Sequence, residues 1–206
     1  PRPRMIEYFD RPSLDLLRER FPDIPPAAAA AVLIEDERDA EFWLERLECS
    51  PALLDDSWFA DNPRDRERFR QFRHALPELV NDIIRRRGVL KMNSDYAVPP
   101  EHNRAMMDFY RARLEAEFPG RYVIFGHIGD AHVHVNILCD SAGEQERASG
   151  LLLELARRAV ALGGTVSAEH GLGKRKAHLL ALQYSHKELA AMRAVKDRLD
   201  PQWLLG

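Results

Sequence analysis

Apolar residues recur at steps of three and four from residue 63 to residue 87, and this spacing predicts one long amphipathic helix. The apolar positions are Phe69, Phe72, Leu76, Leu79, Val80 and Ile83. Asn62 can cap this helix, and Pro63 stands at the first helical position, where a missing N–H is tolerated. Pro77 interrupts the pattern, so we expect the helix to be kinked or divided there.

Shorter apolar and alternating stretches predict the other elements. Strands are expected at residues 29–34, 96–98, 121–128, 132–139 and 165–167. Further helices are expected at residues 39–47, 101–118, 145–162, 176–183 and 186–199. Residues 129–131 form a tight turn that joins two of the strands into a hairpin.

The order of these elements indicates the fold class. Strand, helix, strand, strand, helix and strand follow one another, as in split βαβ sandwiches. We therefore predict an α+β domain at residues 27–206, with a ferredoxin-like antiparallel sheet covered by helices on one face. Residues 1–26 contain six prolines. We expect them to form an irregular N-terminal arm with one short helix near residues 13–20.

Composition narrows the class of protein. Of the 206 residues, 45% are hydrophobic and 31% are charged, as in ordinary globular domains. The net charge of -3 lacks the basic excess that general nucleic-acid binding needs. Cys49 and Cys139 provide no disulfide framework, and no signal peptide is evident. The longest apolar run, residues 27–34, is far below the ~20 residues of a membrane span. We expect a cytoplasmic protein; peripheral membrane attachment through a further segment and a homodimer stay open.

Histidines gather on the predicted hairpin. Alternate side chains of a strand face the same side, so His132, His134 and Asn136 share one face of residues 132–139. The turn brings His127, at the end of the preceding strand, beside them. Neutral imidazole is the commonest metal ligand, and a mixed nitrogen and oxygen shell suits zinc or manganese. Four of the remaining five histidines lie in helical patterns and are expected on the surface: His74, His102, His178 and His186.

A second segment, residues 163–176, supplies a carboxylate. Glu169 and His170 lie on a glycine-bracketed loop directly after a predicted strand, and such loops present side chains to clefts. One carboxylate oxygen added to two imidazole nitrogens makes a three-ligand shell with an open position for substrate. A neighbouring histidine outside the shell is suited to be a general base. Residues and spacing alone indicate an α+β domain with a candidate His/Glu metal site.

Two long motifs resemble those of a known family. GHIGDAHVHVN resembles the GHxGDGNxHxN motif of FAD-linked oxidases related to vanillyl-alcohol oxidase, and GGTVSAEHGLGKRK resembles their GGxxSxEHGxGxxK motif. The chain is most similar to the branch of D-lactate dehydrogenase, the glycolate oxidase flavin subunit and D-2-hydroxyglutarate dehydrogenase. Weaker similarities lie in EYFDRPSLDLL, FRHALPELVN, KMNSDYAVP and LDPQWLLG.

The resemblance implies an activity and residue roles. The family's C-terminal substrate domain packs against a separate FAD-binding domain, and the enzyme oxidises a D-2-hydroxy acid to the 2-oxo acid by hydride transfer to flavin. By motif position, a divalent metal, zinc or manganese, would be held by His127, His134 and Glu169. The remaining roles would be proton acceptance by His170, substrate orientation by Asn136, and carboxylate binding by Arg73 with help from Lys91.

Two departures from the family pattern leave alternatives open. Ala131 and His132 stand where the family has Gly-Asn, so His132 is a candidate additional ligand. Nothing in the chain resembles the glycine-rich FAD-binding segment, so we expect a fragment, or a flavin domain on another polypeptide. A stand-alone metal-dependent hydrolase and a non-catalytic interaction module are the competing interpretations.

Overall fold

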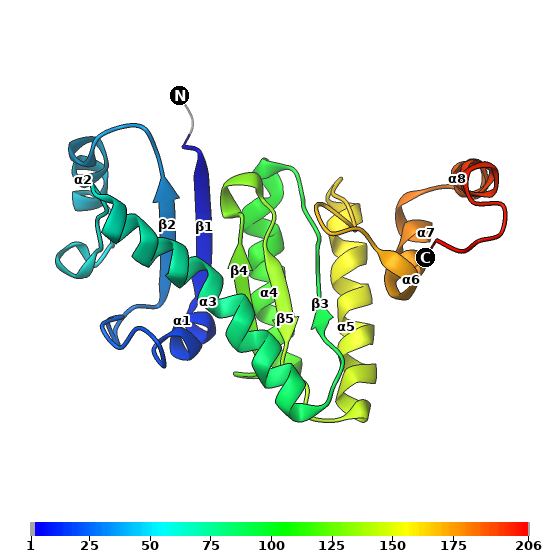
Figure 1. Cartoon of the computed structure of the whole chain (residues 1–206), viewed down its shortest axis with the longest axis horizontal. Helices are drawn as coiled ribbons and strands as arrows, with labels where there is room; N and C mark the ends of the chain where they lie inside the picture. The colour runs from blue at the N-terminus through cyan, green and yellow to red at the C-terminus, as the bar shows by residue number, and fades with distance from the viewer. Residues whose placement is uncertain (1–2, 206) are drawn as a thin grey trace.

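A five-stranded antiparallel sheet forms the centre of the protein, as seen in a computed structural model that describes residues 3–205 (Figure 1). The sheet has the order β2-β1-β4-β5-β3, and every neighbouring pair is antiparallel. The strands are β1 (Met5–Asp10), β2 (Ala30–Glu35), β3 (Met92–Asn93), β4 (Tyr122–Gly126) and β5 (His134–Ile137). The α+β class and the antiparallel sheet predicted from the sequence are confirmed.

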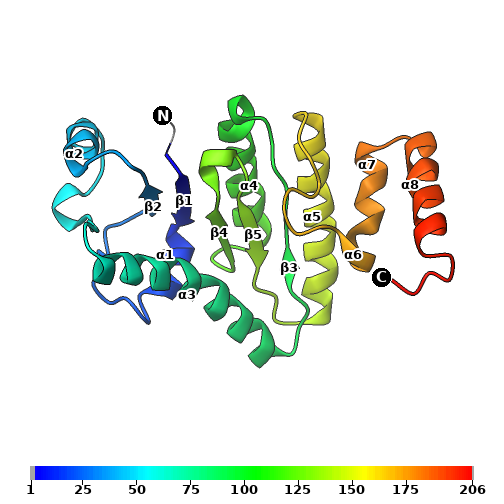
Figure 2. The same ribbon diagram turned by 45° about the horizontal axis from the view of Figure 1, so that its top comes forward.

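Eight α-helices surround or extend this sheet in the described part of the chain. They are α1 (Arg11–Leu17), α2 (Ala40–Glu48), α3 (Pro63–Arg87), α4 (Asn103–Glu117), α5 (Ala142–Ala161), α6 (Gly173–Lys176), α7 (Leu180–Gln183) and α8 (His186–Leu199). Short 3-10 turns occur at η1 (Leu54–Asp56), η2 (Pro100–His102), η3 (Ile128–Asp130) and η4 (Ala177–Leu179). Figures 1 and 2 place α6, α7 and α8 beyond α5, at the end of the molecule opposite α2. None of the described helices has the length and apolar character needed to cross a bilayer.

The sheet separates two hydrophobic cores, because neighbouring residues of a strand point to opposite faces. Ile124 of β4 and Val135 of β5 pack with α4 and α5 in the larger core. Phe9 of β1 and Val123 of β4 pack with α1 and α3 in the other. Figure 1 shows α3 in front of the strands and α4 behind them. The expected single helical layer is therefore incomplete: helices cover both faces of the sheet.

The prediction of an irregular N-terminal arm is wrong for residues 5–10, which form a strand, whereas the short helix expected near residues 13–20 is present as α1. β1 lies inside the sheet, between β2 and β4, and α1 follows it without a break. Asp10 ends β1 and caps α1 by accepting a hydrogen bond from the Ser13 N–H, and it also accepts one from the Ile124 N–H at 2.9 Å. The prolines on either side of β1 and the acidic residues within it conceal a strand that pairing with β2 and β4 stabilises.

Several predicted elements differ in extent. α3 is a single helix that contains Pro77, capped by the Asn62 side chain and closed by Gly88 at φ 64°. The strands expected at residues 96–98 and 165–167 are reduced to isolated bridges from Ala97 to His132 and to Thr165. Through Ala97, these two bridges nevertheless connect the Thr165 segment to the end of the β4–β5 hairpin. That connection positions the loop that follows Thr165.

Candidate metal centre and active site

The β4–β5 hairpin carries three histidines to one end of the sheet. His127 directly follows β4, His132 lies after the turn η3, and His134 begins β5. The backbone N–H of His132 donates to the His127 carbonyl at 3.1 Å and closes this turn. Ala131 has φ 51°, the left-handed conformation in which glycine is favoured. The tight turn therefore persists with alanine in the position where the family motif has glycine.

Gly126 makes room for the His134 ring. Its φ is 121°, and a Cβ added there would lie 2.9 Å from Cδ2 of His134. Only glycine combines this backbone conformation with so close an approach. The His134 imidazole therefore lies against the main chain of β4, beside the His127 and His132 rings, whose centroids are 5.6 and 4.6 Å away.

A buried carboxylate holds the loop that carries Glu169 and His170. Asp95 is 1% exposed. It accepts hydrogen bonds from the N–H groups of Glu169 at 3.2 Å and His170 at 2.9 Å, and from the Ser167 hydroxyl at 3.1 Å. Burial by itself would raise the pKa of Asp95, but these hydrogen bonds outweigh it and leave the pKa below its usual range. Asp95 therefore stays ionised and fixes the loop against the hairpin.

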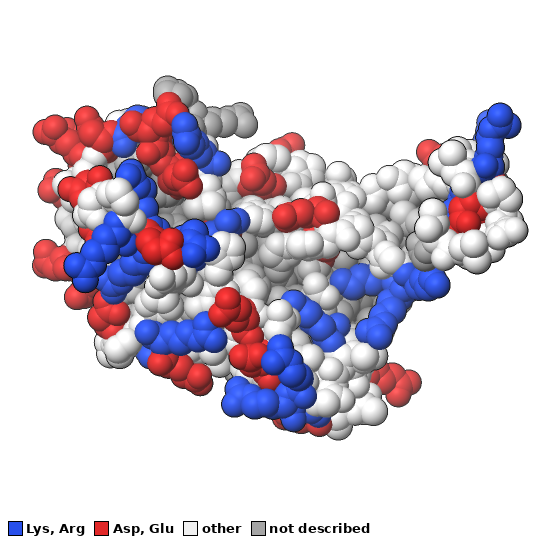
Figure 3. Space-filling model, in the orientation of Figure 1, with Lys and Arg blue, Asp and Glu red and all other residues white. Residues whose placement is uncertain are grey.

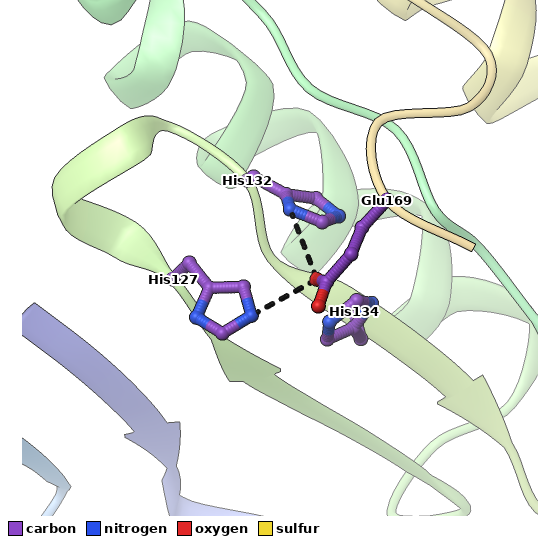
Figure 4. A group of neighbouring side chains, drawn as sticks. All are labelled: His127, His132, His134 and Glu169. Carbon is purple, nitrogen blue, oxygen red and sulfur yellow. Dashed lines mark hydrogen bonds and ion pairs between the residues drawn. The ribbon is translucent and has the colours of Figure 1, made fainter. Parts of the chain in front are cut away.

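Four side chains converge where the loop meets the hairpin. His127, His132, His134 and Glu169 each offer one ligand atom, and these atoms all lie within 4.8 Å of one another. Figure 4 shows the Glu169 carboxylate between the imidazoles. Its Oε2 is 3.1 Å from Nε2 of His127 and 3.9 Å from Nδ1 of His132. A second group, Asp95, His134 and His170, meets the same criterion.

The donor set fits a first-row divalent ion. Such an ion binds imidazole nitrogen and carboxylate oxygen at about 2.0–2.2 Å, so that ligands on opposite sides of it lie about 4.4 Å apart. The 4.8 Å limit within which the four ligand atoms lie is close to that span. The sequence-predicted trio of His127, His134 and Glu169 is therefore brought together, with His132 as a fourth member.

His127 is oriented by a buried acid that the sequence analysis missed. Glu7 of β1 is 3% exposed, and its Oε1 is 2.9 Å from Nδ1 of His127. The same oxygen accepts from Nε of Arg73 at 2.8 Å. The hydrogen bond to Glu7 raises the pKa of His127, against the opposing effect of burial. A carboxylate on Nδ1 leaves Nε2 facing Glu169, as is usual for metal-binding imidazoles.

His134 has the opposite electrostatic setting. Burial lowers its pKa to about 4, and the neighbouring imidazoles of His132, His127 and His170 contribute. His134 is therefore neutral at pH 7, the state in which an imidazole binds metal. The ring of His170, exposed at the surface, lies 5.3 Å from the His134 ring. The residue predicted to accept a proton is thus adjacent to the cluster.

The other residues predicted to bind substrate, Arg73, Asn136 and Lys91, differ in how they are connected to this cluster. Arg73, on α3, reaches it through Glu7. Asn136 lies two positions after His134 on the same face of β5; it is buried, and its Oδ1 has no hydrogen-bond partner in the described residues. Lys91 contacts Asn81 Oδ1 at 3.0 Å. No hydrogen bond or ion pair within residues 3–205 joins Lys91 to the four clustered side chains.

Lys91 instead lines a hollow of about 330 Å³ together with Asn93, Tyr96 and Lys176. Burial lowers the pKa of both lysines. Nζ of Lys176 donates to the Asn93 carbonyl at 2.8 Å. Basic side chains gather in this region of the surface in Figure 3, close to α6. Lys91 is thus part of a basic hollow beside the hairpin rather than part of the cluster.

Two buried acids that contact the histidine cluster, Glu7 and Asp95, are not predicted by the sequence analysis. Glu7 and the apolar Phe9 lie on one face of β1, which is a strand signal, but the surrounding prolines favour an irregular arm. Asp95 lies in the segment KMNSDYAVP, whose similarity to the family is weak and assigns it no role. No sequence spacing links Glu7 to His127 or Asp95 to His132, because each pair joins segments that are far apart in the sequence.

The fold and the site together define an α+β domain with a histidine–carboxylate cluster at the end of a β-hairpin. The family model for FAD linked oxidases, C-terminal domain, matches residues 1–206, and the chain belongs to this family. The family resemblance inferred from the two motifs is confirmed, and with it the assignment of the chain to an FAD-linked oxidoreductase domain.

Curated relatives have related activities in their names. The chain is 28% identical over 213 residues to the glycolate oxidase subunit GlcD of Bacillus subtilis, covering 99% of this chain and 44% of the relative. It is 26% identical over 195 residues to a D-lactate dehydrogenase of Anaerostipes hadrus, covering 93% and 35%. A D-2-hydroxyglutarate dehydrogenase of Xanthomonas citri pv. viticola is 37% identical over 104 residues, covering 47% and 21%. The chain thus spans less than half the length of these relatives.

Proposed function

We propose that this chain is the substrate- and metal-binding domain of an FAD-dependent dehydrogenase that oxidises a D-2-hydroxy acid to the 2-oxo acid. The observation that carries the proposal is the convergence of His127, His134 and Glu169, from a hairpin and a distant loop, with His170 beside them. The names of the relatives, which include glycolate oxidase and D-lactate dehydrogenase, support the substrate class.

In this proposal the trio of His127, His134 and Glu169 would hold a divalent ion, zinc or manganese, which would supply Lewis acidity toward the substrate hydroxyl. Glu7 keeps His127 in the ligand orientation through Nδ1. Asp95 sets the position of Glu169 by binding its N–H.

His170 accepts the hydroxyl proton. It is exposed, adjacent to His134, and its backbone N–H is anchored on Asp95 at 2.9 Å. Oxidation also removes the hydrogen on the α-carbon as hydride, and FAD on a partner domain supplies the acceptor for those two electrons. The chain's own contribution is therefore proton transfer and the placement of the hydroxyl.

Arg73 binds the substrate carboxylate. Nε and one terminal nitrogen of its guanidinium rest on Glu7, which directs the side chain toward the cluster. The other terminal nitrogen lies outside these contacts. Asn136, whose buried Oδ1 has no hydrogen-bond partner among residues 3–205, orients the substrate, and Lys91 assists from the neighbouring hollow.

The first experiment measures ligand binding. The chain loaded with Mn²⁺ or Zn²⁺ is titrated by calorimetry with glycolate, D-lactate and D-2-hydroxyglutarate, and with acetate, propionate and glutarate as hydroxyl-free controls. We expect binding that requires both the metal and the hydroxyl, is lost in His134→Ala and is weakened in Arg73→Ala. Arg86→Ala is the matched control, because Arg86 is exposed on the same helix. Equal binding of hydroxy and hydroxyl-free acids would contradict the proposal.

The second experiment measures oxidation. Joined to a flavin-binding domain, the chain should support reduction of an electron-accepting dye by one of the hydroxy acids. His170→Ala should lower kcat about 10²–10⁴-fold, the usual contribution of a general base. Hydrolysis of esters or amides by the metal-loaded chain without flavin would favour a hydrolase instead.

A further inference from the structure

The structure assigns His132 as a fourth ligand of the metal, so that the donor set is three imidazole nitrogens and one carboxylate oxygen. This inference rests on the metal site of the proposed function and deepens it. The family motif has asparagine at this position, so the fourth ligand is a property of this chain.

The first observation is the orientation of the His132 ring. The side chain is buried, and its Nε2 lies 3.0 Å from Oδ1 of Asp95. The carboxylate of Asp95 engages Nε2 of the ring, so Nδ1 is the nitrogen left to face the cluster. Nδ1 faces Oε2 of Glu169 at 3.9 Å, and Figure 4 shows this nitrogen turned to the carboxylate between the imidazoles. The ring therefore presents a ligand atom to the centre of the cluster.

The second observation is that several hydrogen bonds hold the Asp95 carboxylate in place. It is held by the N–H groups of Glu169 and His170 and by the Ser167 hydroxyl, in addition to His132. This is the carboxylate–imidazole arrangement that fixes the ring of a metal ligand. Asp95 thus holds both the backbone of the Glu169 loop and the ring of His132 in place.

The consequence concerns which ion supports turnover. Structural zinc sites are four-coordinate and closed, whereas catalytic zinc keeps an open position. Four protein donors would therefore leave a tetrahedral Zn²⁺ with no position for substrate. A six-coordinate ion such as Mn²⁺ or Co²⁺ would keep two positions, the number that the hydroxyl and carboxylate oxygens of a 2-hydroxy acid need. We expect Zn²⁺ to bind more tightly than Mn²⁺, following the general affinity order, and to weaken 2-hydroxy-acid binding.

The test counts imidazoles around the metal without relying on activity. The wild-type chain is loaded with one equivalent of Co²⁺, and extended X-ray absorption measures the number of bound imidazoles. Three imidazoles are expected. Two imidazoles would overturn the inference and leave the trio of the proposed function intact, whereas failure of the wild-type chain to retain Co²⁺ would overturn both.

Variants give a second readout. Co²⁺ titration followed by visible absorption should give a dissociation constant about 10–100-fold weaker for His132→Asn, which restores the family residue, and no binding for His134→Ala. His74→Asn, an exposed histidine on α3, is the matched control and should bind as wild type. Unchanged affinity in His132→Asn would refute the fourth ligand. If His132→Asn does not fold, as judged by circular dichroism, the imidazole count on the wild-type chain decides.

Discussion

Replacing Glu7 by alanine removes the buried carboxylate that joins Arg73 to His127, and the structure allows the consequences to be worked out. Glu7 is 3% exposed, and its Oε1 contacts Nδ1 of His127 at 2.9 Å and Nε of Arg73 at 2.8 Å. A hydrogen bond to a charged group contributes about 1.5–3 kcal/mol. The Arg73 side chain is 37% exposed, so water replaces much of its lost contact. We therefore expect a loss of about 2 kcal/mol, or a Tm lower by roughly 4–8 °C in a chain of this length.

The pH dependence of this loss follows from two shifted pKa values. Burial would raise the pKa of Glu7, but the hydrogen bond and charge of His127, with Arg73, outweigh it and leave the pKa lowered. The stabilisation by Glu7 is thus present above the pKa of an unfolded glutamate, about 4.3, and is lost as pH falls through the folded value. The pKa of His127 is raised, so its part is present below about 6.5 and is lost as pH rises through the folded value. The difference between wild type and Glu7→Ala should be largest between about pH 4.5 and 6.5.

The assay is thermal unfolding followed by circular dichroism, in the presence of a chelator, from pH 3.5 to 8.5. Glu78→Ala is the control, because Glu78 forms an exposed ion pair with Arg20 at 2.6 Å, and exposed pairs contribute about 0.2–1 kcal/mol. A second measurement, Co²⁺ affinity, should fall about 10–100-fold in Glu7→Ala, as for other residues that orient metal-binding imidazoles. Equal Tm changes in the two variants, with unchanged Co²⁺ affinity, would refute the reasoning.

Three further predictions test the site and its supports. In the metal-free chain the imidazole of His134 should stay neutral down to about pH 4, which NMR of ¹⁵N-labelled histidine can check. Because burial depresses the pKa of His134 in the folded state, its contribution to stability is present above about pH 6.5. That contribution falls as the pH drops toward 4, which unfolding curves can check. Gly126→Ala, with φ 121° and a Cβ 2.9 Å from the neighbouring imidazole, should weaken Co²⁺ binding at least tenfold, whereas Gly150→Ala in the open part of α5 should raise stability by about 0.5–1 kcal/mol. Asp10→Ala, which removes a buried helix cap, should lower the unfolding free energy by about 2 kcal/mol. Asp39→Ala, which removes an exposed cap, should lower it by about 0.5 kcal/mol. Equal losses in urea denaturation would show that the buried hydrogen bonds of Asp10 add nothing beyond capping.

Much of the fold was readable from local patterns. The apolar spacing of α3, its Asn62 cap and the apolar face of α5 depend on residues within one or two turns, and the structure has these helices. The hairpin was also predictable, because a tight turn between two apolar strands is a local signal. β1 was not, since its acidic residues conceal a strand that only pairing with β2 and β4 stabilises.

The same division applies to the site. Alternation along the strand predicted at residues 132–139 put His132 and His134 on one side, and two motifs indicated His127 and Glu169 as ligands, so the sequence alone determined which side chains are the candidate donors. Only the tertiary structure decided that Glu7 and Asp95 orient the imidazoles, since each contact spans a large sequence separation: 120 residues for Glu7 with His127 and 37 for Asp95 with His132. The physical reason is that a hydrogen bond between side chains depends on distance in space, and sheet order, which no local pattern encodes, sets that distance.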